Sequence, residues 1–343
     1  MKQFNFAEDV VSTEITVTDG FGDGGVGIIQ GSNLTTSSLS AAQKNYYYNL
    51  QFNSKDHLSV SYGHIAGSGS SEQSTTVEGT TKAVYGQFYS LLENDRSKLK
   101  RNTGFIINNV TASDAYFIVA ERLQMKDRLN PGTFTLSFSG SSTDGTATTL
   151  NLTDNSKTTD ATAAPFGEKY SLQVGSAGVV TDTTEHGFFY PDAGIFVLSA
   201  AQMSSSLPGD PALITSGSNS HVGFTGTGLA PDLRVADAVD NARKATLALQ
   251  KGSVTLRSEE KQFIYDYFCR AKANEFNYSQ NLTFWSGSQY DIRHTDMINN
   301  PQVYITEVGL YDEAGELMAI GRLSSALEKN FSSEAIIKVR LTY

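Results

Sequence analysis

The chain has 343 residues, a formal net charge of −10 at pH 7 and a single cysteine, Cys269. The acidic balance argues against nucleic-acid binding, because negative charge repels phosphate. One cysteine excludes a disulfide within the chain. The first residues lack the apolar segment of a secretory signal, and no apolar run approaches the roughly 20 residues that cross a bilayer. We therefore expect a protein that is made in the cytoplasm and does not insert into membranes.

The hydrophobic share is 39%, and 19 Phe and 16 Tyr residues supply much of it. Aromatic and β-branched residues fit half-buried pleated sheets better than helices. The N-terminal part accordingly predicts strands at 14–18, 46–52 and 58–62, with turn residues at 53–56. One helix is expected over 82–93, where Val84, Phe88, Leu91 and Leu92 recur at helical spacing.

The next segments continue the β pattern. Residues 105–107 and 116–120 are apolar enough to be buried on both faces, and 126–132 has the composition of a turn. In 134–138 Phe and Leu alternate with Thr and Ser, which predicts a strand with one solvent-facing side.

From residue 139 to 227 Thr, Ser, Gly, Ala and Asp dominate, and we interpret this segment as an inserted Ser/Thr-rich β domain. Its turn residues come at short intervals, which is typical of an all-β unit. Strands are expected at 148–152, 169–174, 187–190 and 195–198. Residues 1–138 and 228–343 would then form the core β domain or domains, with a short helix within 232–251. The predicted fold class is mainly β, with β-sandwich-type domains and a few short helices.

The C-terminal part has the clearest pattern. Residues 263–270 alternate as a strand would, although a helix that begins at Ser258 is a competing interpretation. Residues 303–311 and 317–321 predict a hairpin, which closes the core domain. The turn at 312–316 contains Gly315, which is free to adopt a positive φ. One more strand is expected at 335–341.

Several patterns resemble sites of known chemistry but lack the necessary context. Residues 22–27 read GDGGVG, the dinucleotide fingerprint, yet no helix start follows them, and Asp23 places negative charge where a phosphate would lie. A calcium loop that uses Asp19 and Asp23 lacks a third carboxylate at a known spacing. The basic cluster at 98–101 is offset by nearby acids and is typical of a solvated turn.

The five histidines show neither helical i, i+4 pairing nor cysteine partners, so no zinc site is predicted. His57 and His64 flank a strand, and a metal pair between them is less expected than two surface or interface histidines. Cys269 lies in an aromatic run and is interpreted as a small core residue. No serine lies in a nucleophile elbow. We therefore predict no enzymatic activity, no cofactor and no metal.

A resemblance to known proteins is carried by residues 304–321, YITEVGLYDEAGELMAIG, and by residues 274–284, NEFNYSQNLTF. The first segment resembles a strand, turn and strand motif of tailed-phage tail proteins, including baseplate components and tail-fibre attachment domains. The second resembles a companion motif in virion proteins of contractile-tailed, T4-like phages, although Leu282 stands where a Pro is usual. Residues 60–70 and 86–92 add to this similarity, which covers about a third of the chain.

The resemblance implies a structural subunit of the virion tail, most specifically a baseplate wedge component present in several copies beside other tail proteins. Alternatives are a tail terminator, a neck or fibre-attachment protein, a carbohydrate- or receptor-binding module in 139–227, and a particle-embedded hydrolase. Because tyrosines and end strands favour interfaces, the expected contact residues belong to the C-terminal strands. They are Tyr304, Tyr311, Lys338, Arg340 and Tyr343. Lys338 and Arg340 have a second interpretation, as charges that guard a free sheet edge.

Overall fold

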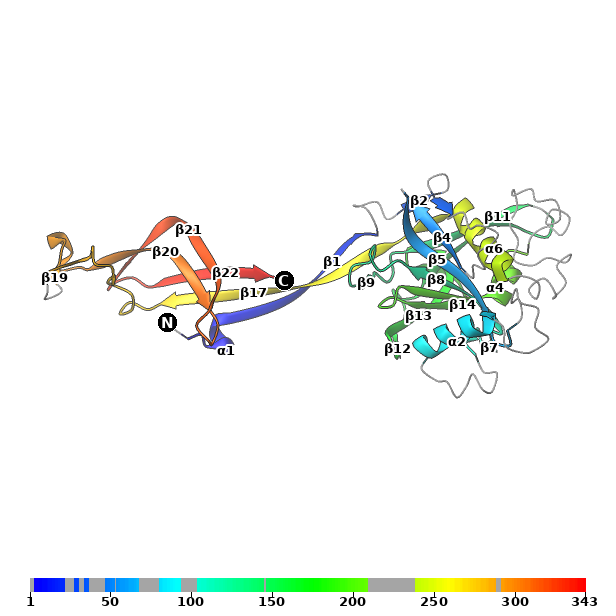
Figure 1. Cartoon of the computed structure of the whole chain (residues 1–343), viewed down its shortest axis with the longest axis horizontal. Helices are drawn as coiled ribbons and strands as arrows, with labels where there is room; N and C mark the ends of the chain where they lie inside the picture. Colours follow the sequence, from blue (N-terminus) through cyan, green and yellow to red (C-terminus); the bar gives the residue numbers. More distant parts are fainter. Residues whose placement is uncertain are drawn as a thin grey trace. The chain divides into compact units, whose positions relative to one another are not determined.

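The structure is a computed structural model of the chain. It describes residues 3–21, 28–30, 34–36, 47–52, 54–67, 80–93, 104–144, 146–208, 238–287 and 291–343. Its contacts divide the chain into two compact units (Figure 1). Unit 1 comprises residues 1–16 and 261–343, and unit 2 comprises residues 17–260. Antiparallel sheets dominate both units and the helices are few, so the predicted mainly β fold is confirmed.

Unit 2 is built on one sheet of 12 strands in the order β2-β16-β10-β11-β13-β14-β15-β8-β5-β4-β3, with β12 paired to β13. Its strands are β2 (Ile28–Gln30), β3 (Leu34–Thr36), β4 (Tyr47–Phe52), β5 (Lys55–His64), β8 (Asp114–Ala120), β10 (Thr135–Ser141), β11 (Ala147–Asp154), β12 (Thr162–Ala164), β13 (Gly167–Ser176), β14 (Val179–Tyr190), β15 (Ile195–Ser199) and β16 (Ser253–Thr255). The remaining elements are the short pair β6 (Ile106–Ile107) and β7 (Val110–Thr111), β9 (Arg128–Leu129), and the helices α2 (Thr80–Leu92), α4 (Ala200–Ser206) and α6 (Ala238–Lys251).

Both faces of this sheet are covered by helices, as β8 illustrates (Figure 1). Its Tyr116 and Ile118 belong to one hydrophobic cluster, which also contains residues of α6. Phe117, between them in the chain, belongs to a second cluster, which contains residues of α2. Because successive strand residues point to opposite faces, α6 and α2 lie on opposite sides of β8. The prediction that 116–120 is buried on both faces is confirmed.

The contacts do not separate the expected inserted domain, residues 139–227, from the residues on either side of it, because residues 17–260 form one unit. Strands β11, β13, β14 and β15 come from this segment, and they lie in the middle of the unit 2 sheet. β15 pairs with β8, and β10 pairs with β16, so both ends of the segment continue into strands outside it. Composition shifts at residue 139, but the hydrogen-bonded ladder does not break there.

Three burial expectations in unit 2 need correction. Residues 105–107 were expected to be buried on both faces, but Ile106 is 53% exposed, because β6 pairs only with the short strand β7. Helix α2 turns Tyr85, Tyr89 and Leu92 into the core, while Leu91, expected on the buried face, is 41% exposed. In β10 the side expected to face solvent is covered in part: Thr135 and Ser139 are half-buried, whereas Ser137 is 8% exposed and donates a hydrogen bond to Asn151 Oδ1 at 2.7 Å. Tyrosine rings and hydrogen-bonded serines can be buried, so a prediction of burial from apolar residues alone misses them.

Unit 1 contains parts of two long strands, β1 (Val10–Gly20) and β17 (Arg257–Ala271), which also carry residues of unit 2. β17 lies between β1 and β22 (Ala335–Thr342) in one sheet, and β9 pairs with its unit 2 end. β20 (Gln302–Tyr311) and β21 (Leu317–Asn330) form a separate antiparallel hairpin. Smaller elements are α1 (Phe6–Asp9), the pair β18 (Trp285–Ser286) and β19 (Asp291–Ile292), and the 3-10 helix η3 (Thr295–Met297).

The C-terminal expectations agree well with these elements. Residues 257–271 form strand β17, which excludes the helix that was expected to compete from Ser258. The predicted hairpin is present, and its turn is held by a 2.7 Å bond from the Glu316 N–H to Asp312 Oδ1. Gly315 has φ +85°, so the prediction of a positive φ at this residue is confirmed.

Some predictions concern residues outside those that the structure describes. They include the GDGGVG segment at 22–27, the basic cluster at 98–101 and His221, one of the five histidines. Residues 209–227 of the expected inserted domain also fall there, and so does Asp23 of the calcium hypothesis.

Candidate interaction surface

The two units differ sharply in where they place apolar side chains. Among the described residues, 24 large hydrophobic side chains are exposed, and 17 of them lie in unit 1. Of the 45 hydrophobic residues that are buried in the described part of the chain, only Ala271, Phe284, Leu310 and Ala335 belong to unit 1. Neither hydrophobic cluster contains a unit 1 residue. Large exposed apolar surfaces mark sites where other molecules bind, so unit 1 is the candidate interaction surface.

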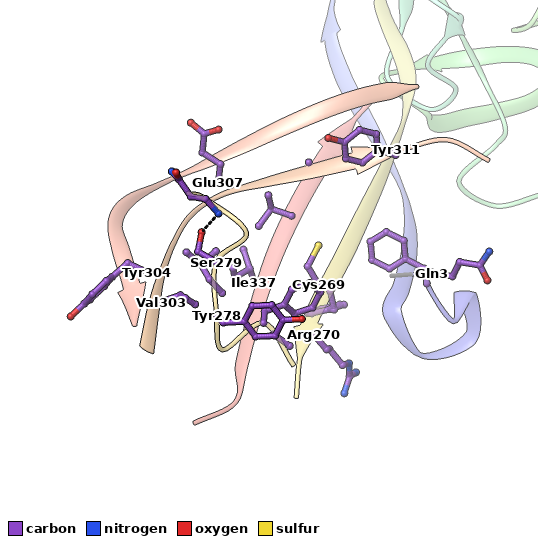
Figure 2. A pocket seen from close by; sticks show the side chains of 18 of the residues that line it. Gln3, Cys269, Arg270, Tyr278, Ser279, Val303, Tyr304, Glu307, Tyr311 and Ile337 are labelled. Carbon is purple, nitrogen blue, oxygen red and sulfur yellow. Dashed lines mark hydrogen bonds between the residues drawn. The ribbon is translucent and has the colours of Figure 1, made fainter. Parts of the chain in front are cut away.

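Two of the three tyrosines predicted at the interface, Tyr304 and Tyr311, lie on β20. Tyr304 is 54% exposed and faces Glu328 across the hairpin, while Tyr311 is 48% exposed and faces Leu317. Figure 2 shows the two rings toward opposite ends of the strand. A strand advances about 3.3 Å per residue, so seven residues separate them by roughly 23 Å. They do not form one cluster, although each contributes an aromatic face to the surface of unit 1.

Lys338 and Arg340 lie on β22, and both contact Asp266 of β17. Arg340 holds this carboxylate with two bonds of 2.8 and 2.9 Å, and Lys338 Nζ lies 2.7 Å from it. The side chain of Asp266 is only 11% exposed. The Arg340 guanidinium, and then Lys338, lower the pKa of Asp266 far below its usual range. Lys338 and Arg340 therefore bind a carboxylate of their own sheet. One positive charge remains, because Asp266 carries a single negative charge.

Tyr343 continues the ladder between β22 and β17. Its N–H and carbonyl exchange bonds of 3.0 and 3.2 Å with Phe263, and its ring lies 5.8 Å from that of Tyr265. The residue is nevertheless 67% exposed. Burial, and secondarily Tyr343, raise the pKa of the nearby Tyr267 hydroxyl. All five predicted contact residues are thus exposed parts of unit 1, and their role in an interface stays a prediction.

An open hollow of about 1670 Å³ separates the hairpin from the β1–β17–β22 sheet. Figure 2 shows Cys269 and Ile337 of the sheet on one side of it and Val303 of the hairpin on the other. Where hairpin and sheet do approach, a Cβ at Gly321 would lie 3.6 Å from Val339. Protein interiors have few voids larger than a water molecule. This hollow has room for roughly fifty waters, so the two layers of unit 1 do not form a packed core between them.

The sequence reasoning missed much of this surface. Met318 and Ile320 on β21 are 70% and 56% exposed, and Ile336 on β22 is 60% exposed. A signal for them exists, because residues 317–320 read LMAI and are apolar on both faces of a strand. That pattern predicts burial on two sides, whereas β21 belongs to a two-stranded hairpin.

A serine and a histidine in unit 2 adopt a geometry that also occurs in catalytic sites. His186 Nε2 lies 2.8 Å from Ser206 Oγ, and its Nδ1 lies 3.0 Å from the Thr184 carbonyl, which requires the proton on Nδ1. Burial lowers the pKa of His186. However, Ser206 ends helix α4, where the negative end of the helix dipole opposes an oxyanion. We interpret the pair as a structural bond between β14 and α4.

The other histidine expectations are also answered by the structure. The expectation of a surface or interface residue is wrong for His57, which is 1% exposed and packs as a core residue between the rings of Phe21 and Phe52, at 5.9 and 5.7 Å. His64 lies seven residues further along the same strand, roughly 23 Å away, so the two do not meet at a metal. Among the described residues, no group of three or more His, Cys, Asp or Glu side chains is placed to hold a metal ion.

Cys269, interpreted from the sequence as a core residue, is half-buried, and burial raises the pKa of its thiol. In the described part of the chain no helix is both long enough and apolar enough to span a membrane. Comparisons with protein-family models, with curated proteins and with solved structures find no match to the chain.

Proposed function

We propose that this protein is a structural assembly subunit that holds neighbouring proteins through unit 1, and that the assembly is the tail of a bacteriophage. The observation that carries the assembly role is the apolar balance of unit 1, whose described residues include 17 exposed large hydrophobic side chains and four buried hydrophobic residues. A surface of this kind is costly in water and is stabilised when partner chains cover it.

The tail is proposed on the resemblance of residues 304–321 and 274–284 to segments of tail and baseplate proteins. Both segments lie in unit 1, the unit that needs covering. Within a tail, a baseplate wedge component fits best, because such a subunit must bind several neighbours through large interfaces. Stable interfaces bury about 1,200–2,000 Å² or more.

The same proposal includes the absence of enzymatic activity and the absence of nucleic acid among the partners. The Ser206–His186 pair gives a direct way to test the first of these. Loss of a hydrolytic activity of the purified protein on Ser206→Ala would contradict it, whereas Ser90→Ala serves as a control at another helical serine.

The experiment that tests the tail assignment is mass spectrometry of purified virions and of isolated tails from the phage that encodes the chain. We expect the protein in both, at a constant ratio to other tail proteins. Its absence from purified particles would overturn the proposal. Deletion of residues 335–343 then tests the role of unit 1, and we expect a chain with an intact unit 2 and arrested tail assembly. Normal tails from that deletion would show that β22 holds no neighbour.

A further inference from the structure

The side chains of Lys329 and Asn277 meet inside unit 1, although 52 residues separate them in the chain. Lys329 lies on β21, and Asn277 belongs to the loop that follows β17. Lys329 is fully buried and Asn277 is 2% exposed. The Lys329 Nζ atom lies 2.6 Å from Asn277 Oδ1. Since a carbonyl bond is about 1.23 Å long, Nζ lies no more than about 3.8 Å from the amide carbon Cγ.

The other contacts of the Lys329 amine are also with uncharged groups. Nζ donates to the carbonyls of Asn330 and Ala273, at 2.8 and 3.2 Å. Among the residues that the structure describes, no carboxylate pairs with this amine. Burial of an ammonium group without a counter-ion is costly. A desolvated lysine of this kind is a setting in which the amine acts as a nucleophile.

The carbonyl of Ala273 contacts both nitrogen atoms of the pair. It accepts a hydrogen bond from Asn277 Nδ2 at 2.7 Å and another from Lys329 Nζ at 3.2 Å. The first bond orients the carboxamide so that its oxygen faces Lys329. The amine, the amide carbon and the amide nitrogen are therefore held together in one buried site.

We propose that Lys329 and Asn277 join in an intramolecular isopeptide bond. The uncharged amine of Lys329 attacks Cγ of Asn277, so that the Nζ–Cγ bond forms and the Cγ–Nδ2 bond breaks. One Nζ proton passes to Nδ2, which leaves as ammonia. The reaction is balanced without an oxidant, a reductant or a cofactor. Well-oriented groups within one molecule react as if at effective concentrations of about 10⁵–10⁸ M, which favours attack by a side chain already in contact.

A covalent link of this kind would strengthen a unit that has few other means of holding together. Among the described residues, unit 1 buries only four hydrophobic side chains, and a single cysteine excludes a disulfide within the chain. Domains without a sufficient core are commonly held by covalent links or metals. A bond between positions 277 and 329 ties the loop to β21 and constrains the unfolded chain over 52 residues. The inference does not depend on the proposed assembly role.

Mass spectrometry of the purified full chain tests the proposal. We expect an intact mass that is lower than that of the sequence by one ammonia. Trypsin cuts after lysine and arginine, so its digest should contain peptide 273–293 joined to peptide 323–338, uncut at Lys329. An intact mass equal to that of the sequence overturns the proposal. Loss of ammonia without the joined peptides, as an internal imide of an asparagine would give, overturns it as well.

Variants at both positions assign the reacting groups. Lys329→Arg keeps a cation but has no amine, and Asn277→Ala removes the amide carbon, so we expect both chains to have the masses of their sequences. Lys261→Arg is the matched control, because Lys261 is a half-exposed lysine paired with Glu14. It should still lose one ammonia and give the joined peptides. Loss of ammonia that persists in Lys329→Arg would place the reaction elsewhere and contradict the proposal.

Discussion

Unit 2 and unit 1 are both made of antiparallel strands with many aromatic and branched side chains, and the two units bury them very differently. In unit 2, neighbouring strands form a long ladder, and helices α2 and α6 cover opposite faces of it. In unit 1 a three-stranded sheet and a two-stranded hairpin face each other across an open hollow. The same residue types therefore form a core in one unit and a surface in the other.

The comparison shows that strand content does not determine whether a domain is complete. A two-stranded hairpin is at best marginally stable in water, and three or more strands with a covered face are needed for independent stability. Unit 2 satisfies this condition within one chain. Unit 1 does not, so its stability should depend on contacts with other chains, whereas that of unit 2 should not.

The largest expected effect tests the self-sufficient core of unit 2. Phe196 is fully buried, and its ring lies 4.8 Å from that of Phe189 and 5.1 Å from that of Phe134. We expect Phe196→Ala to lower the free energy of unfolding by about 3–5 kcal/mol, because it removes buried contacts and leaves a cavity. Chemical denaturation of the purified chain measures this change.

Phe331→Ala is the matched control in unit 1, since Phe331 is 55% exposed. Truncation of an exposed side chain usually changes stability by less than about 0.5 kcal/mol. Similar losses at the two phenylalanines would contradict the contrast between the units.

The next effect concerns Lys329, the most deeply buried charged side chain of unit 1 among the described residues. Lys329 is fully buried, and its Nζ donates to Asn277 Oδ1 at 2.6 Å and to the carbonyls of Asn330 and Ala273 at 2.8 and 3.2 Å. It ties β21 to the loop at 273–277. Lys329→Met leaves the Asn277 and Asn330 oxygens without this donor, and each unsatisfied buried group costs about 1–3 kcal/mol.

We expect this loss to appear in unit 1 as faster hydrogen exchange over 317–330, with little change in unit 2. Lys261→Met is the control, because Lys261 pairs with Glu14 at the surface and its side chain is 52% exposed. Surface pairs contribute about 0–1 kcal/mol. Equal effects of both variants on hydrogen exchange would mean that the hydrogen bonds of Lys329 do not stabilise β21.

Gly315 tests the hairpin turn. Its φ of +85° is accessible to glycine, whereas a β-branched residue is strained there by about 1–2 kcal/mol. Gly315→Val should therefore raise hydrogen exchange and protease cleavage at the ends of β20 and β21. Ala314→Val places the same side chain one residue earlier, at an exposed position that is not among the positive-φ residues. Cleavage that is equally slow in both variants would count against the strained turn.

The hairpin turn is an example of the local structure that the sequence predicts well. Local patterns determine the hairpin, helix α2 and the strand at 335–341, because turn residues and apolar periodicity act over a few neighbouring positions. They also predict that Tyr304 and Tyr311 lie in strands. In each case the signal and the structure it specifies are in the same segment.

Long-range pairing is where the sequence reasoning fails. The pairing of β5 with β8, and of β1 with β17, joins segments that are distant in the chain. Composition alone gave a boundary at residue 139, yet the Ser/Thr-rich strands continue the same ladder as their apolar neighbours. The incomplete burial of unit 1 was also not predicted. Burial depends on which sheets and helices pack together, and this packing, like strand pairing, joins distant segments of the chain.

The smallest expected effect concerns Asp266 and the β17–β22 ladder. The Arg340 guanidinium and the Lys338 ammonium lower the pKa of Asp266 in the folded protein, while in the unfolded chain it is about 3.9. A depressed folded pKa means that the charged form stabilises the fold. The contribution is fully present above about pH 4 and is lost as the pH falls below that value toward the folded pKa.

The measurement compares the wild-type chain with Asp266→Asn by denaturant unfolding between pH 7 and pH 3. The difference in stability should be constant from pH 7 to about pH 5 and should shrink below about pH 4, since the unfolded wild type then binds a proton that the folded form does not. Glu307→Gln is the control, because Glu307 pairs with Arg322 on an exposed part of the hairpin, and such pairs contribute little. A difference that grows as the pH falls would reverse the sign of the argument. It would mean that the folded protein does not hold Asp266 as a carboxylate, and that β22 joins β17 without this ion pair.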